Sequence, residues 1–244
     1  MKGLILLPIG ILALGGYVYA GSHLAQGTYA AVKGNGKLKT ENRSVPAYTK
    51  VVIGSAFEGQ FFESTPGPLT ISAESNILPL IETKVENETL FVNVKGSVST
   101  RKGFRITGRT AKLAAFEAGG AAKMELKNIG RHALKLEASG ASKVSVFGTP
   151  SSLDVDASGA SEIAFGTLTL ESLIVELSGA SKLSLAGTTK SANISASGAS
   201  NFTGNISGEK FKAVASGASK VEIKGHFNTS TTSASGASSI SKPY

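Results

Sequence analysis

The residues best suited to acid–base chemistry are carboxylates that recur in the second half of the chain. Asp154 and Asp156 share one short stretch, and Glu137 and Glu176 stand at the equivalent positions one repeat before and one repeat after Asp156. If the strands that carry them stack, Glu137, Asp156 and Glu176 form a column. Such a column suits weak cation binding, or an enzyme that acts on acidic polysaccharides. A solvated strand face explains the same residues more simply, and we favour that interpretation.

Histidine offers a second route to catalysis, but its spacing supports none. The three histidines are His23, His132 and His226, and none stands at metal-ligand spacing with another histidine or a pair of carboxylates. His132 and His226 lie beside glycines at predicted corners, where we expect exposed loop side chains. The sequence also lacks a calcium-binding nonapeptide and a phosphate-binding glycine loop. We therefore predict no catalytic residue, no metal site and no cofactor.

The element that must position these residues is a repeat built on the tetrapeptide Ser-Gly-Ala-Ser. It occurs six times, after a degenerate copy at residues 119–122. The central glycines of the seven copies recur at a nearly fixed period, and a period of about 20 residues is typical of a solenoid. These glycines are Gly120, Gly140, Gly159, Gly179, Gly198, Gly217 and Gly236.

Apolar residues alternate with polar ones on both sides of each corner glycine. Before Gly159, for example, stand Leu153, Val155 and Ala157, and Ile163 follows it. This period of two is typical of a half-buried strand, and it excludes a helix, where such residues would point to different faces. Each repeat is therefore two short strands joined by a corner. Stacked repeats predict an all-β, single-stranded parallel β-helix with coils of about 19–20 residues around a thin apolar core.

Stacking places equivalent residues in columns that run from coil to coil. The serines that open and close each corner form two columns, and the residues after the closing serines form a third column that faces solvent. A serine nucleophile needs one activated copy with a base and an orienting acid, so six equivalent copies favour a structural ladder. The opening serines are Ser139, Ser158, Ser178, Ser197, Ser216 and Ser235; the closing serines are Ser142, Ser161, Ser181, Ser200, Ser219 and Ser238; the third column is Lys123, Lys143, Glu162, Lys182, Asn201 and Lys220.

Composition limits the classes of function. The chain has 25 Lys and Arg against 17 Asp and Glu, a formal net charge of +8. Such a charge suits nucleic acid, anionic lipid or acidic glycans, but the basic residues are scattered with little aromatic interleaving, so we predict no nucleic-acid binding. The chain has no cysteine, which excludes disulfides, thiolate metal sites and a lipid-modified cysteine.

The N-terminus has the pattern of an export signal. Residues 1–20 begin with the charged residue Lys2 and continue with an apolar run. Small residues then precede a possible cleavage site after Ala20. This predicts a secretory signal peptide, with a cut after Ala25 or an uncleaved membrane anchor as the alternatives. In each case the remainder lies outside the cytoplasm. Residues 21–47 are predicted to be a linker and a first strand.

The remaining residues, 48–244, are predicted to form one β-helix domain. Residues 48–110 show strand alternation without the regular period of the repeats, so we expect irregular, wider coils that cap the stack. Residues 111–244 form the regular coils. In the last coil Ser230 and Thr232 replace apolar inward residues, as a terminal coil that meets water requires.

Two stretches of the sequence resemble a known bacterial family. The first, non-repetitive stretch comprises residues 35–45, 51–57 and 76–83, and the second is the repeat Leu-x-Leu-x-Ala-Ser-Gly-Ala-Ser-Lys-Val itself. Both resemble putative auto-transporter adhesins with a head GIN domain, over about residues 34–240. The resemblance implies a right-handed parallel β-helix exported to the periplasm or cell surface, and it implies no established activity.

The expected function is therefore that of a non-catalytic, exported cell-envelope protein with an adhesin-like binding module. The flat coil faces suit an envelope or host glycan, or an envelope protein, through many weak contacts that add by avidity. The alternatives are a purely structural envelope scaffold and a polysaccharide-acting enzyme. Contact with a membrane is expected only through an uncleaved N-terminal segment. The tyrosines lie outside the repeats, which argues against an aromatic sugar platform: Tyr17, Tyr19, Tyr29, Tyr48 and Tyr244.

Overall fold

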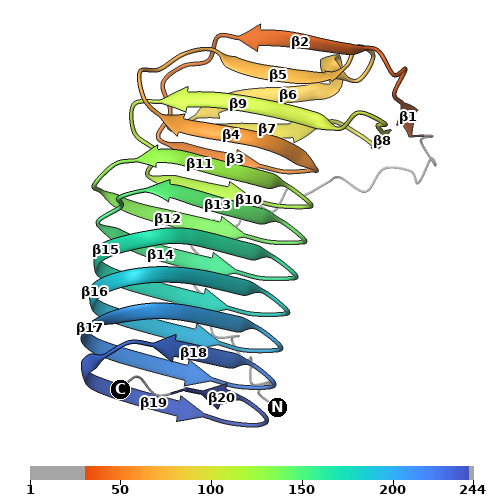
Figure 1. The fold of residues 1–244 in the computed structure, drawn as a ribbon. Helices are drawn as coiled ribbons and strands as arrows, with labels where there is room; N and C mark the ends of the chain where they lie inside the picture. The colour runs from red at the N-terminus through yellow and green to blue at the C-terminus, as the bar shows by residue number, and fades with distance from the viewer. Residues whose placement is uncertain (1–30, 242–244) are drawn as a thin grey trace, which may run out of the picture. The chain divides into compact units, whose positions relative to one another are not determined.

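The computed structural model describes residues 31–241, which fold almost entirely into β-strands (Figure 1). The predicted signal peptide, with Ala20 and Ala25 as its alternative ends, lies outside the described residues, as does His23. Residues 31–241 belong to one compact unit.

The described residues contain twenty strands and one short 3₁₀ helix, η1 (Leu78–Leu80). In chain order the strands are β1 (Val32–Lys33), β2 (Leu38–Arg43), β3 (Lys50–Ile53), β4 (Phe57–Glu63), β5 (Leu69–Glu74), β6 (Ile81–Glu86), β7 (Thr89–Val94), β8 (Val98–Ser99), β9 (Phe104–Thr110), β10 (Ala115–Ala118), β11 (Lys123–Ile129), β12 (Ala133–Ala138), β13 (Lys143–Gly148), β14 (Ser152–Ala157), β15 (Glu162–Leu177), β16 (Lys182–Ala196), β17 (Asn201–Ala215), β18 (Lys220–Lys224), β19 (Phe227–Ala234) and β20 (Ser239–Ile240). We call residues 31–110 the cap and residues 111–241 the coils.

Each regular coil contains strands joined by a corner, which is Gly-Gly-Ala-Ala at residues 119–122 of the first coil and Ser-Gly-Ala-Ser in the following coils. β14 ends at Ala157, the corner occupies residues 158–161, and β15 begins at Glu162. Equivalent strands pair in parallel and in register, so Leu153 lies beside Leu134 on one side and Leu173 on the other. Figure 1 shows the coils stacked one on another below the cap. The predicted parallel β-helix is confirmed.

The inward side chains form a thin apolar core that continues from coil to coil. Leu136, Val155, Val175 and Ile194 share one inward column, and all four are fully buried. The side chains between inward positions point outward, as the period-two alternation predicts. Burying a side chain of this size contributes about 1.5–3 kcal/mol, so the repeated columns are a main source of stability.

The corner glycines allow both a left-handed backbone and a close approach between coils. Gly179 has φ of 67°, and a Cβ there would lie 2.5 Å from the carbonyl oxygen of Gly159 in the preceding coil. The next residue, Ala180, donates its N–H to that same oxygen at 2.7 Å. Equivalent bonds occur at each corner from Ala141 to Ala237. Glycine therefore lets successive corners hydrogen-bond directly to each other.

The cap combines two kinds of strand pairing. β3 and β4 pair in parallel with β10 and β11 of the first regular coil, and with β7 and β9 on their other side. Farther out the pairing is antiparallel: β2 with β5, β5 with β9, and β6 with β7. The cap thus continues the β-helix only in part. Sequence alternation does not reveal the change, because parallel and antiparallel strands both have a period of two.

A buried carboxylate holds the outer part of the cap together. Glu74 is fully buried, and its Oε1 accepts the N–H of Gly36 at 2.6 Å. Its Oε2 accepts the hydroxyl of Thr100 at 2.6 Å and the N–H of Arg101 at 3.1 Å. These bonds, that of Thr100 first, hold the pKa of Glu74 below its usual range. One side chain therefore joins the loop before β2 to the loop before β9.

The last coil lacks an apolar interior, as its sequence predicts. In β19 the inward positions carry Ser230, Thr232 and Ala234, and these residues are exposed or half-buried. Phe227, at the start of β19, is the last large buried side chain along the chain in the described residues. The stack therefore ends without a broad apolar surface.

Candidate binding face

The predicted column of carboxylates is present and is longer than expected. The register of β10, β12, β14 and β15 places Glu137, Asp156 and Glu176 side by side and adds Glu117 before them. Each of the four stands three residues before its corner glycine. Applying that spacing to the degenerate first repeat would have predicted Glu117 as well.

Burial and like charges raise the pKa of two members of this column. Burial raises the pKa of Glu117, and Glu137 raises it further. Burial, then Glu176 and Glu137, raise the pKa of Asp156. Lys135 offsets part of the repulsion, because its Nζ lies 2.8 Å from Oε1 of Glu137. In the part of the chain that the structure describes, no three His, Asp or Glu side chains are placed to hold a metal ion.

Some closing serines bond neighbouring coils, as the predicted structural ladder requires, whereas the hydroxyls of Ser142, Ser161 and Ser200 are buried without a hydrogen-bond partner among the described residues. The hydroxyl of Ser181 donates to the carbonyl oxygen of Ala157, and that of Ser219 donates to the carbonyl oxygen of Ala196, each at 3.1 Å. Both acceptors are backbone groups of a neighbouring coil rather than a catalytic base. Five closing serines are at most 1% exposed: Ser142, Ser161, Ser181, Ser200 and Ser219.

The prediction for His132 was wrong, whereas His226 is exposed as expected. The side chain of His132 is only 16% exposed, and its Nε2 lies 2.7 Å from Oε2 of Glu63. Glu63 also accepts the N–H groups of Leu113 and Gly130, at 3.1 and 3.2 Å. The pair joins β4 of the cap to the turn after β11. Glu63 and His132 are 69 residues apart, so no local pattern connects them.

The third predicted column faces solvent, as expected, except at Asn201, which is half-buried. Glu162 lies between Lys143 and Lys182, and Nζ of Lys143 is 2.9 Å from Oε1 of Glu162. Lys123 pairs with Glu58 of the cap at 3.0 Å. Exposed pairs of this kind contribute about 0–1 kcal/mol, so the column affects surface charge more than stability.

A second outward column on the same strands carries cations and aromatic rings. We call it the outer row. The ring centre of Phe62 lies 5.9 Å from Cζ of Arg109 and 5.8 Å from Nζ of Lys127, and Phe147 is 50% exposed. Strand register places Arg109, Phe62 and Lys127 side by side, and likewise Thr167, Ala186, Asn205 and Lys224. Between these two groups Phe147 lies on β13, one residue after Val146, which pairs with Leu126 and Phe165. These eight residues make up the outer row.

The sequence argument about aromatic residues missed this row because it considered tyrosines alone. Tyr48 is buried, which raises its pKa to about 12, so it offers no platform. Phe147, however, follows the inward residues Val144 and Val146 on β13. Strand alternation therefore places Phe147 on the outside, and this parity could have predicted its exposure.

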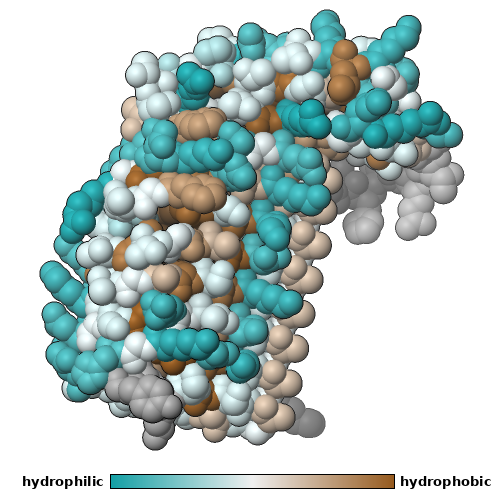
Figure 2. Space-filling view, viewed as in Figure 1, coloured by the Kyte–Doolittle hydropathy of each residue, from teal (hydrophilic) through white to brown (hydrophobic). Residues whose placement is uncertain are grey.

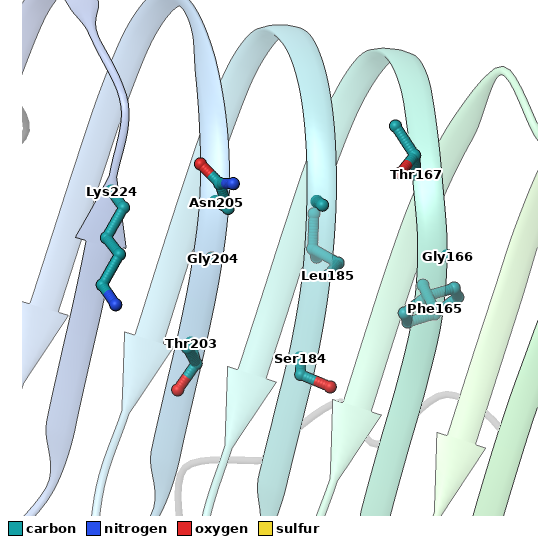
Figure 3. Close-up of a pocket in the computed structure, with 10 residues that line it drawn as sticks. Phe165, Gly166, Thr167, Ser184, Leu185, Thr203, Gly204, Asn205 and Lys224 are labelled. Atoms are coloured by element: carbon teal, nitrogen blue, oxygen red, sulfur yellow. The ribbon is translucent and has the colours of Figure 1, made fainter.

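A shallow hollow of about 410 Å³ lies along the outer row (Figure 3). Phe165 and Leu185, which are 8% and 5% exposed, form its apolar floor. No carboxylate and no histidine is among the described residues that line it. Figure 3 shows the hydroxyls of Ser184 and Thr203 on one side, the amide of Asn205 and the hydroxyl of Thr167 on the other, and the ammonium group of Lys224 at one end.

The two faces of the coils differ in charge. We define the basic face as the outward side of β11, β13, β18 and the first parts of β15–β17. We define the acidic face as the outward side of β10, β12, β14 and residues 172–177 of β15. Within the four coils at residues 115–182, the basic face has four ammonium groups and two carboxylates: Lys123, Lys127, Lys143, Lys182, Glu125 and Glu162. The acidic face has one ammonium group and five carboxylates: Lys135, Glu117, Glu137, Asp154, Asp156 and Glu176. Figure 2 shows apolar side chains interrupting the polar covering of the coils.

Comparison with known families places the chain in a described family. The chain matches the family described as "Putative auto-transporter adhesin, head GIN domain" over residues 47–205, which is more than half of its 244 residues. The match includes strands of both the cap and the coils. A comparison with curated proteins finds no match. Between residues 31 and 241 no helix has the length and apolar character needed to cross a membrane.

Solved structures share the fold. A putative adhesin from Bacteroides fragilis has a TM-score of 0.70 and 21% identity, over 86% of this chain and 99% of its own. A putative adhesin from Parabacteroides merdae has a TM-score of 0.69 and 18% identity, over 86% and 98%. A protein from Parabacteroides distasonis called a putative lipid binding protein has a TM-score of 0.64 and 18% identity, over 86% and 98%. At these identities the likeness shows the fold alone.

Proposed function

The chain belongs to the family of putative auto-transporter adhesins with a head GIN domain, and we propose that it is a non-catalytic, exported protein of the cell envelope whose coils form a binding module. Its location outside the cytoplasm rests on the N-terminal sequence, where Lys2 and an apolar run precede small residues at Ala20. The periplasm and the cell surface both agree with that pattern.

The observation that carries the proposal is the outer row on the basic face. It presents a half-exposed ring at Phe147 and a hollow that continues past Asn205 to Lys224. Exposed aromatic and cationic groups in line with a hollow suit recognition of an extended ligand. Contacts that repeat from coil to coil can add to a useful affinity even when each one is weak.

The arrangement of titratable groups supports binding rather than catalysis. The four aligned carboxylates from Glu117 to Glu176, the acidic column, lie on the acidic face. None of them is among the described residues that line the hollow. Among the described residues that line the hollow on the basic face, only Lys224 is titratable. An acid and a base are therefore not brought together at that recessed position, as an enzyme site needs.

A binding screen tests this function. The full chain, exported by its host and purified, is mixed with peptidoglycan, lipopolysaccharide, and host glycans or matrix at low and high salt. We expect saturable binding to at least one fraction, and part of that binding should persist at high salt. Binding that disappears entirely with salt would mean that charge attraction alone is responsible, without apolar contacts of the outer row. Absence of binding to all fractions would instead support a purely structural envelope scaffold.

A further inference from the structure

We propose that the outer row binds a linear acidic polysaccharide that lies along the coil stack, across the strands. This inference rests on the proposed binding function and adds the chemical class of the ligand and its direction. The row crosses eight strands from Arg109 to Lys224. At roughly 4.8 Å between neighbouring strands, its length is about 34 Å. A track of this length suits a polymer better than a single small molecule.

Charge indicates an anionic ligand. The outer row itself contains three cations, Arg109, Lys127 and Lys224, and no carboxylate. Lys127 and Lys224 do contact carboxylates of the neighbouring column, Glu125 at 2.9 Å and Glu222 at 3.6 Å. Such exposed pairs are weak, about 0–1 kcal/mol, so the anionic groups of a ligand can compete for the same ammonium groups. The acidic face on the other strands would repel the same ligand.

The aromatic and polar groups indicate a sugar polymer. Phe147 is half exposed and lies in line between Lys127 and Thr167, so its ring can pack against the apolar face of a sugar ring. Beyond it, the floor of Phe165 and Leu185 offers further apolar contact. Hydroxyl and amide groups along the hollow can hydrogen-bond to sugar hydroxyls: Thr167, Ser184, Thr203 and Asn205.

An anionic membrane is the other source of negative charge, and the geometry favours it less. Insertion into a bilayer needs apolar groups that project together from a surface. Here the one large half-exposed apolar residue in the row is Phe147, and the apolar floor is recessed between polar side chains. A polymer thin enough to lie in the hollow can reach that floor, whereas a flat membrane surface cannot.

The test measures binding of the full chain to polygalacturonate and to a sulfated galactan by calorimetry. A neutral glucan, short oligomers of polygalacturonate and phosphatidylglycerol vesicles serve as comparison ligands. We expect saturable binding to at least one acidic polymer, weaker binding to the short oligomers, and none to the neutral glucan. Binding to the vesicles with no binding to either polymer would overturn the proposal in favour of a membrane ligand.

Matched variants locate the site. Phe147→Ala removes a ring that is 50% exposed on the basic face, and Ile174→Ala removes a side chain that is 40% exposed on the acidic face. Because both side chains point outward, both variants should keep the melting temperature of the parent chain. We expect Phe147→Ala to weaken binding of the acidic polymer by about tenfold, since the lost ring contact is apolar burial, and Ile174→Ala to change it less than about twofold. Equal effects of the two variants would overturn the proposal.

A second pair tests the charge. Lys127→Gln in the outer row should weaken polymer binding by about threefold to tenfold, whereas Lys212→Gln on the other side of the coils should have little effect. Equal effects would mean diffuse attraction by net charge and would overturn the proposal. If envelope fractions bind the chain but neither acidic polymer does, this inference fails while the proposed binding function stands. If nothing binds, both fail.

Discussion

Residues 111–241 repeat the same contacts from coil to coil, whereas residues 31–110 depend on contacts that occur once. In the coils, the bond from Ala180 to the carbonyl oxygen of Gly159 has an equivalent at each neighbouring corner. In the cap, one carboxylate, that of Glu74, accepts hydrogen bonds from two different loops. The coils therefore repeat one set of polar contacts, whereas the outer cap adds single polar contacts to its own buried apolar side chains, such as Leu69 and Ile71.

This difference determines how far a local change should spread. A solenoid is stabilised mainly by contacts between nearest neighbours, so damage at one corner should disturb the adjacent coils first. A change in the outer cap should open loops there and leave the coils intact, because the parallel strands β3 and β4 still cover the first coil. The predictions below test this contrast, from the largest expected effect to the smallest.

Gly179→Val should have the largest effect. The backbone at Gly179 is left-handed, and any Cβ there would lie 2.5 Å from the carbonyl oxygen of Gly159. A β-branched residue in that conformation costs about 1–3 kcal/mol before the clash is counted, so we expect a loss of about 3 kcal/mol in unfolding free energy. Chemical denaturation measures it. Ala180→Ser, at the adjacent exposed position, is the control and should stay within about 0.5 kcal/mol of the parent chain.

Glu74→Gln should loosen the outer cap without disturbing the coils. The variant replaces one carboxylate oxygen by an amide that cannot accept the hydrogen bonds of Gly36 or of Thr100 and Arg101. We expect amide hydrogen exchange to become about tenfold faster or more at Gly36 or at Arg101, whichever N–H group faces the amide nitrogen of the glutamine. Exchange at Ala180 in the coils should not change. Equal acceleration in both regions would show that the cap and the coils open together.

The same carboxylate gives the cap a dependence on pH. The hydrogen bond from Thr100, with backbone bonds, lowers the pKa of Glu74 in the folded state. Its contribution is therefore complete above the usual pKa of glutamic acid, about 4.3, and is lost as pH falls through the lower folded-state value. In the parent chain, the protection of Gly36 from exchange, taken relative to the intrinsic exchange rate at the same pH, should fall in that acidic range. Glu74→Gln should lack this fall in protection, and its persistence there would assign it to another group.

The coils could be predicted from the sequence because their contacts repeat. The period of the corner glycines gives the coil length, and alternation around Gly159 gives the inward and outward positions. Glu117 and Phe147 follow from the same two rules when these are applied to every repeat. The antiparallel pairing in the cap does not follow, because alternation is the same in both kinds of sheet.

The polar contacts of the cap could not be predicted, because each joins residues that are distant in sequence. Glu74 accepts hydrogen bonds from Gly36, which precedes it in the sequence, and from Thr100, which follows it. Neither of these two sequence separations recurs elsewhere as a repeat. Glu63 and His132 are 69 residues apart, and only the fold brings them together. A local sequence pattern carries information about corners and strand faces, not about such single pairings.

His132→Ala tests the junction between the cap and the coils and should have an intermediate effect. The variant removes the partner 2.7 Å from Oε2 of Glu63, while the N–H groups of Leu113 and Gly130 remain bonded to that carboxylate. Because only one of three partners is lost, we expect about 1 kcal/mol of destabilisation. Arg131→Ala, at the exposed neighbouring position, is the control. No change in the denaturation midpoint of His132→Ala would show that the contact is not stabilising.

Asp156→Asn should have the smallest effect and the opposite sign. Asp156 lies between Glu137 and Glu176, and removing its charge relieves repulsion within the acidic column. Because the side chain is only partly removed from water and its charge is largely screened, we expect a gain of only about 0.3 kcal/mol at neutral pH. Ser195→Asn, in the next coil of the same column, is a control that removes no charge.

The pH dependence of Asp156→Asn shows which charge dominates the acidic column. Burial, then Glu176 and Glu137, raise the pKa of Asp156, so ionising it is less favourable in the folded chain than in the unfolded chain. This cost is absent below the unfolded-state pKa of about 3.9 and appears as pH rises through the folded-state value. The advantage of the variant in urea denaturation should therefore vanish in acid. If Asp156→Asn is instead less stable than the parent chain at neutral pH, the attraction of Asp156 to Lys135 is stronger than its repulsion by Glu137 and Glu176. The acidic column would then be a network of mixed charge, in which Lys135 compensates the carboxylates.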